Sequence, residues 1–122
     1  MVKTGAGVDT TMSLSDTEGH VRLGLPNVTT AVAAADGGVD PLVADTVGYG
    51  NGAVGPETAP AAAATFTSGQ SLERKANLNS TAATMTGADA ALGNNRDSDN
   101  NGADFVVRTT RQPQTKLSTP EP

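Results

Sequence analysis

The sequence is poor in the residues that build a large hydrophobic core. It has no cysteine, no tryptophan and no isoleucine, and only one tyrosine and two phenylalanines occur in 122 residues. Without cysteine, a disulfide framework, a thiolate metal site and a cysteine nucleophile are excluded. Much of the 36% hydrophobic content is alanine, which buries little apolar surface. We therefore expect one small domain of marginal stability.

Positive charge and long apolar runs are also scarce. Eight lysines and arginines stand against thirteen acidic residues, which gives a formal net charge of −5. A nucleic-acid surface needs clustered cations, so we predict no nucleic-acid partner. No segment approaches the length of a transmembrane helix, and the first residues lack the apolar run of a signal peptide. We therefore predict no membrane insertion and no signal peptide in this chain.

Short alternating segments favour an all-β fold. Apolar residues alternate with polar ones on both sides of a predicted turn, at Met12, Leu14, Val21, Leu23 and Leu25. This pattern is typical of a half-buried β-hairpin. The period of two turns these five side chains toward the core and directs His20 and Arg22 to solvent.

Three further strands are predicted in residues 42–50, 65–75 and 104–108. In the first of these, Gly48 and Gly50 indicate a bulge or a close backbone approach. Residues 51–64 have little to bury and predict a surface connection, and residues 77–96 predict a long mobile loop too polar to pack. The alanines at 31–35 allow one or two helical turns. Residues 1–7 are expected to be a flexible start, and residues 113–122 a proline-rich tail or linker.

An acidic segment suggests a calcium site. Asp97-Ser98-Asp99-Asn100-Asn101-Gly102 matches the first half of a calcium-binding loop, in which oxygen ligands alternate before a glycine. The twelfth position is Arg108, which excludes an EF-hand. A looser Ca²⁺ site could use four side chains, those of Asp97, Asp99, Asn101 and Asp104. Alternatively, the segment is a turn whose side chains bond the local backbone. We expect no other cofactor.

The remaining polar residues do not predict an enzyme. His20 is the only histidine, and a histidine at a hairpin turn is usually solvated, so no catalytic residue is assigned. Arg74 and Asp104 either form an ion pair between neighbouring strands or are both exposed. Glu73 and Lys75, of the opposite parity, are expected in solvent. Three aromatic side chains are expected in the core, namely Tyr49, Phe66 and Phe105.

Three segments in order resemble the C-terminal half of a bacterial lamin-tail domain. They are Asp45-Thr46-Val47-Gly48-Tyr49-Gly50, then Gln70-Ser71-Leu72-Glu73-Arg74-Lys75, then the segment from Asp97 to Phe105. The pattern is D-x-V-G-Y-G, then S-x-x-R, then D-x-D-x-N-x-A-D-F, and the resemblance spans residues 8–112. The motifs of the family's opening strands have no counterpart in this sequence.

The resemblance implies an immunoglobulin-like β-sandwich, here partial or divergent, with long loops rich in alanine, glycine and threonine. It assigns structural roles to Gly48, Tyr49, Gly50, Arg74 and Phe105. It also implies a noncatalytic structural or interaction module of a bacterial secreted or cell-surface protein, with an extracellular or cell-surface location. Its partner would be another protein or a second copy bound at open strand edges. The alternative is a self-assembling β subunit of an extracellular filament or surface layer that uses strand addition.

Overall fold

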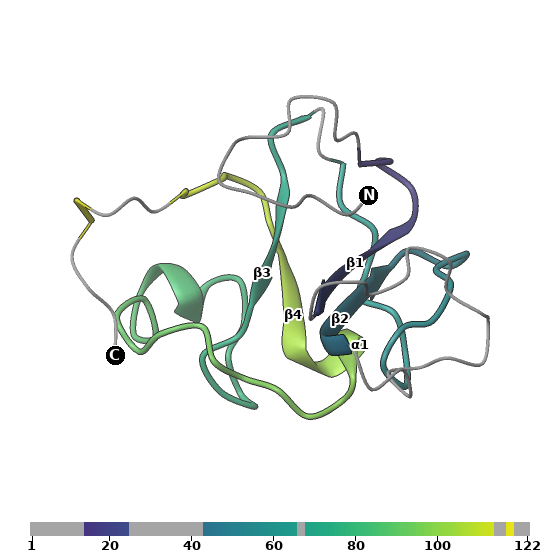
Figure 1. The fold of residues 1–122 in the computed structure, drawn as a ribbon. Helices are drawn as coiled ribbons and strands as arrows, with labels where there is room; N and C mark the ends of the chain where they lie inside the picture. The colour runs from purple at the N-terminus through teal and green to yellow at the C-terminus, as the bar shows by residue number, and fades with distance from the viewer. Residues whose placement is uncertain (1–13, 25–42, 66–67, 114–116, 119–122) are drawn as a thin grey trace.

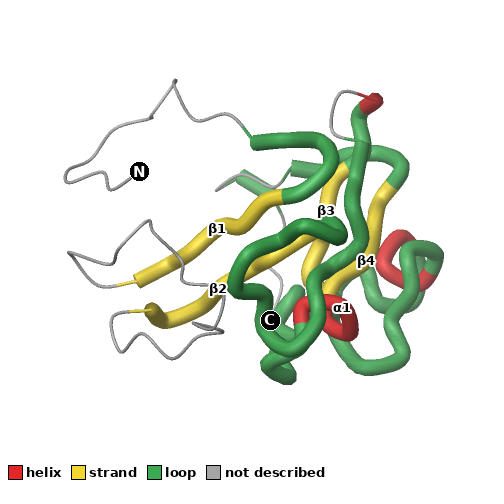
Figure 2. The backbone as a smooth tube through the Cα atoms, turned by 90° about the vertical axis from the view of Figure 1, so that its right-hand side faces the viewer, coloured by secondary structure: helices red, strands yellow, loops and turns green. Residues whose placement is uncertain are grey.

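The computed structural model describes residues 14–24, 43–65, 68–113 and 117–118. Within them the chain is β-rich, with four short strands in two antiparallel pairs and little helix. The strands are β1 (Gly19–Gly24), β2 (Val43–Tyr49), β3 (Ser71–Arg74) and β4 (Phe105–Arg108) (Figure 1). The helices are the 3₁₀ turn η2 (Thr84–Thr86) and the single turn α1 (Asn101–Asp104). Figure 2 shows the two strand pairs beside each other, with α1 leading into β4.

The first sheet pairs β1 with β2. Val21 lies opposite Val47, and the register shifts where Leu23 faces Asp45 and Gly24 faces Val43. Ala44 is therefore the extra residue of a β-bulge on β2. The predicted strand at 42–50 is confirmed, although its bulge lies at Ala44 and not at a glycine.

The predicted hairpin is wrong for the residues that the structure describes. Leu14 lies outside any strand, and β1 pairs with β2 across a long connection. The facing is reversed as well, because Val21 and Leu23 are 45% and 67% exposed while His20 and Arg22 are half-buried. The alternation of β1 was correct, but the face of the sheet that packs is decided by its partner β2.

The second sheet pairs β3 with β4, and Leu72 lies opposite Val107 and Arg74 opposite Phe105. The predicted strands at 65–75 and 104–108 are confirmed in shorter form. Asp104 closes α1 instead of opening the strand. The predicted helical turns at 31–35, the start at 1–7 and Phe66 lie outside the described residues, as does most of the predicted tail at 113–122.

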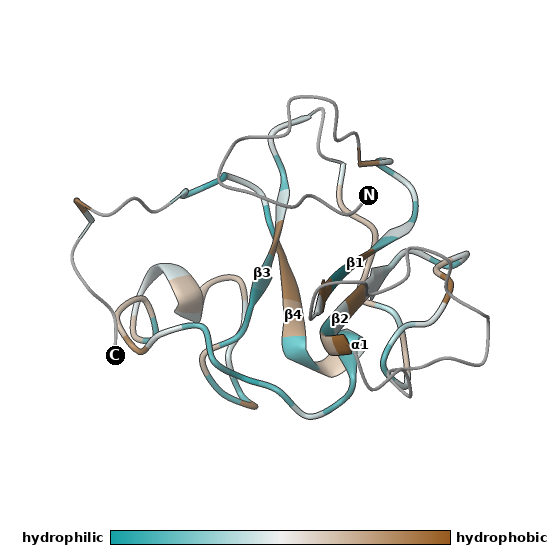
Figure 3. Cartoon of the chain, viewed as in Figure 1, coloured by the Kyte–Doolittle hydropathy of each residue, from teal (hydrophilic) through white to brown (hydrophobic). Residues whose placement is uncertain are grey.

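The interior is unusually polar. The buried apolar side chains among the described residues are Tyr49, Ala61, Ala64 and Met85, whereas the largest fully buried ones are Asn101, Thr46 and Asp104. Figure 3 shows hydrophobic colour in short stretches of the strands, with the loops mostly pale or hydrophilic. The expectation that residues 51–64 are a surface connection with little to bury, and residues 77–96 a loop too polar to pack, is wrong in part, because Ala61, Ala64 and Met85 are buried.

At two glycines near Tyr49 other groups approach the backbone too closely to leave space for a Cβ. The Tyr49 ring is buried, and its hydroxyl donates a hydrogen bond to the Ser15 carbonyl at 2.8 Å. A Cβ added to Gly19 would lie 2.6 Å from that hydroxyl, and one added to Gly48 would lie 2.7 Å from Pro56. The predicted close approach at Gly48 is confirmed, as is core packing of Tyr49. Phe105 is only half-buried.

A buried hydroxyl in β2 gives a first prediction. Thr46 is fully buried, and among the described residues its Oγ1 has no hydrogen-bond partner. We expect Thr46→Val to raise the free energy of unfolding by about 1 kcal/mol, because it removes a desolvated hydroxyl and keeps the shape of the side chain. Urea unfolding measures the effect. Thr46→Ser is the matched control, since it keeps the hydroxyl and loses the methyl group, and a stabilised serine variant would contradict the explanation.

Candidate functional site

The acidic segment of the sequence folds around the helical turn α1. The Asn100 side chain accepts a hydrogen bond from the Ala103 N–H at 3.2 Å and so caps this turn. Asn101 and Asp104 are three residues apart and therefore lie on the same side of the turn. Both are fully buried. The turn thus directs an amide and a carboxylate into the protein.

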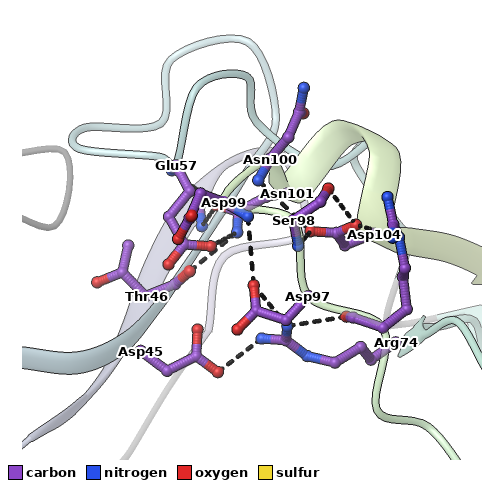
Figure 4. A network of polar contacts seen from close by, with 12 residues as sticks. Asp45, Thr46, Glu57, Arg74, Asp97, Ser98, Asp99, Asn100, Asn101 and Asp104 are labelled. Carbon is purple, nitrogen blue, oxygen red and sulfur yellow. Dashed lines mark hydrogen bonds and ion pairs between the residues drawn. The ribbon is translucent and has the colours of Figure 1, made fainter.

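The Asn101 side chain is the centre of a buried network (Figure 4). Its Oδ1 accepts hydrogen bonds from the N–H groups of Gly48 at 2.8 Å and Glu57 at 3.1 Å. Its Nδ2 donates to the Thr46 carbonyl at 2.9 Å and to the Glu57 carboxylate at 2.7 Å. An asparagine side chain has two acceptor positions and two donor hydrogens, so its hydrogen-bonding capacity is filled. Asn101 therefore joins α1 to β2 and to the loop at Glu57.

The main chain strengthens the same junction. Residues 57–61 are bonded to α1 on one side and to β2 on the other. On the α1 side, the Asn101 N–H donates to the Glu57 carbonyl at 3.1 Å and the Gly102 N–H to the Ala59 carbonyl at 2.8 Å. On the β2 side, the Ala61 N–H donates to the Gly48 carbonyl at 2.8 Å and the Gly50 N–H to the Ala61 carbonyl at 2.9 Å. The segment predicted as a surface connection is therefore built into the fold next to β2.

Asp104 is held by the loop that precedes it. Its carboxylate accepts hydrogen bonds from the Ser98 N–H and hydroxyl, each at 2.7 Å, and pairs with Arg96 at 3.1 Å. Burial acts to raise the pKa of Asp104, but the bonds from Ser98 and Asn100 and the charge of Arg96 outweigh it and lower the pKa below 3.8. Both alternatives for Arg74 and Asp104 are wrong, because Asp104 pairs with Arg96 and the side chains of Asp104 and Arg74 are only 0% and 15% exposed.

Arg74 instead connects the two sheets. Its guanidinium lies 2.6 Å from Asp45 of β2 and 3.5 Å from Asp97, and it donates to the Arg96 carbonyl at 3.1 Å. The same group stands over the Phe105 ring, 4.8 Å from its centroid. A single side chain of β3 therefore contacts β2, β4 and the loop before α1.

A further ion pair, which the sequence did not predict, lies on the other face of the β3–β4 sheet. Arg108 is buried, pairs with Glu73 and donates to the Gln112 side chain at 2.8 Å. The expectation that Glu73 and Lys75 are in solvent is wrong, since both are half-buried. The signal in the sequence was an arginine continuing an apolar strand, where a buried charge requires a partner.

The four calcium candidates do not converge. Asp97 and Asp99 are exposed, and the Asp97 carboxylate accepts the Asp99 N–H at 3.3 Å in a local turn, as the alternative interpretation expected. The oxygens of Asn101 and Asp104 are occupied by the bonds described above. In the described part of the chain no group of three or more acidic or histidine side chains could hold a metal ion. The calcium hypothesis thus gains no support from this arrangement.

Glu57 is the site residue that the sequence did not indicate. It is 8% exposed. Burial raises the pKa of its carboxyl above 4.5, the charges of Asp45 and Asp97 raise it further, and hydrogen bonds from the Thr46 backbone and Asn101 act in the opposite direction. No pattern in the sequence marks Glu57, because the side chain that bonds its carboxylate, Asn101, is 44 positions away in the chain.

The raised pKa of Glu57 predicts a pH dependence of stability. A carboxyl whose pKa is higher in the folded state favours folding below its unfolded pKa of about 4.5, and this contribution is lost as the pH rises through the raised value. We expect the urea midpoint to fall over that window, and Glu57→Gln to flatten the slope. The control Glu18→Gln changes an exposed carboxylate. This variant should show the same slope of stability against pH as the wild type. An unchanged slope in Glu57→Gln would contradict this assignment.

The comparisons with known proteins give no relative. No protein-family model, no curated protein and no solved structure matches the chain. Among the described residues, no helix has the length and apolar character needed to cross a membrane.

Proposed function

We propose that this chain is a noncatalytic structural or interaction module, with a partial or divergent immunoglobulin-like arrangement of its strands. One observation carries the proposal: Asn101, the largest fully buried side chain among the described residues, uses all four of its hydrogen bonds to hold β2, α1 and the loop at Glu57 together. The polar groups of Asp104 and Arg74 are likewise bonded to other groups of the protein. Groups that a reaction or a metal would need are thus committed to the fold.

The resemblance to a bacterial lamin-tail domain supports the same function. Its matched residues Gly48, Tyr49 and Arg74 occupy positions at which strands and loops meet, which fits a structural role for each. With that resemblance we also propose a secreted or cell-surface protein of a bacterium as the parent, and another protein as the binding partner.

The amide spectrum of the full chain, recorded with and without about 1 mM Ca²⁺, tests the structural role of the acidic segment. We expect the resonances of residues 97–104 to stay in place, because the four candidate side chains do not converge and the oxygens of Asn101 and Asp104 already accept hydrogen bonds within the protein. Asp97→Asn provides the comparison, since it removes an exposed carboxylate of the candidate site. Saturable shifts that Asp97→Asn abolishes would contradict the proposal and establish a calcium module.

Hydrolysis of simple phosphoesters by the pure chain would contradict the noncatalytic assignment.

Self-assembly by strand addition is the second candidate function, and β1 favours it. Within the described residues β1 pairs with β2 alone, and its Leu23 side chain is 67% exposed. A strand edge with apolar side chains is a template for a further strand. A second copy of this chain could extend the sheet there.

Sedimentation velocity at rising protein concentration distinguishes the two functions. If strand addition operates, the wild type associates and Leu23→Lys remains monomeric, because a charge on an edge strand opposes pairing. Leu78→Lys is the matched control, as Leu78 is 63% exposed but lies in the loop of residues 77–96. A wild type that stays monomeric throughout rejects strand addition and leaves the first proposal.

A further inference from the structure

Two copies of the same tripeptide occupy opposite environments in this protein. Asn-Gly-Ala occurs at residues 51–53 and again at residues 101–103, and no other asparagine precedes a glycine. Asparagine followed by glycine is the pair in which the main-chain nitrogen can most easily reach the side-chain carbonyl carbon, because glycine has no Cβ to hinder the approach. The two sites therefore form an internal comparison of the same chemistry.

The first site is open. Asn51 and Gly52 are both exposed, at the centre of a turn closed by the Ala53 N–H, which donates to the Gly50 carbonyl at 3.2 Å. No described residue makes a hydrogen bond to the Asn51 side chain or to the Gly52 N–H. Both reacting groups are thus free of hydrogen bonds to the described residues that would have to break before they meet.

The second site is closed. The Asn101 amide is fully buried and makes four hydrogen bonds, and the Gly102 N–H is bonded to the Ala59 carbonyl at 2.8 Å. The nitrogen that would attack and the amide that would be attacked are both held in other bonds. Reaction at this site requires the network to open.

We propose that Asn51 is a site of spontaneous deamidation and isomerisation in the folded protein, and that the fold protects Asn101 from the same reaction. The Gly52 nitrogen attacks Cγ of Asn51 and forms a five-membered succinimide. The bond from Cγ to Nδ2 breaks, and the amide leaves as ammonia with the proton lost from Gly52. Water then opens the ring at either carbonyl, which gives aspartate or isoaspartate. No oxidation or reduction takes place.

The surroundings of Asn51 make the modification consequential. A Cβ added to Gly52 would lie 2.6 Å from a carboxylate oxygen of Glu18, so that carboxylate lies against the turn. Conversion of Asn51 places a second negative charge beside it. Isoaspartate also adds a methylene to the main chain, next to Gly50, whose φ of +78° and close approach to Glu18 leave little space.

Peptide mapping by mass spectrometry tests the proposal on the full chain. The protein is incubated at mildly alkaline pH, at a temperature where circular dichroism shows it folded, and a parallel sample is kept in denaturing urea. Fragmentation that separates aspartate from isoaspartate assigns each product. We expect Asn51 to convert at least about tenfold faster than Asn101 in the folded chain, and the two rates to become similar in urea.

The variant Asn51→Gln provides the control, because a glutamine side chain forms the cyclic imide far more slowly. It should abolish the early product and leave the slow conversion at Asn101 unchanged. Equal rates at the two sites in the folded chain would overturn the proposal. So would the absence of conversion at Asn51 under conditions where the urea sample reacts at both sites.

Discussion

Replacing Asn101 with alanine is expected to lower the free energy of unfolding by about 3–5 kcal/mol, because unsatisfied buried groups cost roughly 1–3 kcal/mol each and water recovers part of this. The substitution removes the partner of the Gly48 and Glu57 N–H groups, of the Thr46 carbonyl and of the Glu57 carboxylate. Small domains have total stabilities of only about 5–15 kcal/mol. The variant should therefore lose a large part of its stability and unfold at a clearly lower urea concentration than the wild type.

Urea unfolding followed by circular dichroism measures this loss. Asn95→Ala is the matched control, since it truncates an exposed asparagine of the loop before α1. A surface change of this kind is expected to stay within about 0.5 kcal/mol of the wild type. Similar stabilities for the Asn101 and Asn95 variants would show that the Asn101 bonds contribute little.

Replacing Arg74 with alanine gives the second large effect, a loss of about 2–4 kcal/mol, because a partly buried ion pair with Asp45 is broken and the Asp45 carboxylate loses its cation. The Arg74 side chain is 15% exposed and faces Asp45 at 2.6 Å and Asp97 at 3.5 Å. The contact with the Phe105 ring is lost as well. The stability of Arg74→Lys should lie between those of the wild type and Arg74→Ala. Lysine keeps the positive charge but lacks the planar guanidinium group.

A double-mutant cycle isolates the pair across the two sheets. Arg74→Ala combined with Asp45→Asn is expected to show a coupling energy of about 1–2 kcal/mol. The control combines Arg74→Ala with Asp89→Asn, whose hydrogen-bonding partner Asn77 belongs to the loop of residues 77–96. That pair should be additive within about 0.5 kcal/mol. Additivity of the Arg74 and Asp45 changes would mean that the two side chains do not join the sheets energetically.

Local patterns were sufficient where the structure depends on neighbours in sequence. Residue parity located β2, a short apolar run located β4, and the glycine at position 48 correctly indicated that another segment approaches the backbone closely. The turn at Asp97 and Asp99 is another local feature, because the bond between them spans two residues. These elements follow from backbone geometry and short-range bonding.

Partners distant in sequence could not be predicted in the same way. Arg74 had several possible carboxylates, and the choice of Asp45 over Asp104 depends on how β3 lies relative to β2. The face of β1 that packs likewise depends on its pairing with β2. Asn101 fits both a calcium loop and a buried junction, because the oxygens that attract a cation also accept hydrogen bonds from main-chain N–H groups.

We infer that a buried polar network, more than a hydrophobic core, holds this fold together. Native-state hydrogen exchange of the Gly48 and Glu57 amides tests it most directly, because both donate to the Asn101 side chain. We predict that both exchange only through global unfolding, as slowly as the best-protected amides of the strands. Rapid exchange of these two amides in a chain whose strands remain protected would contradict the claim.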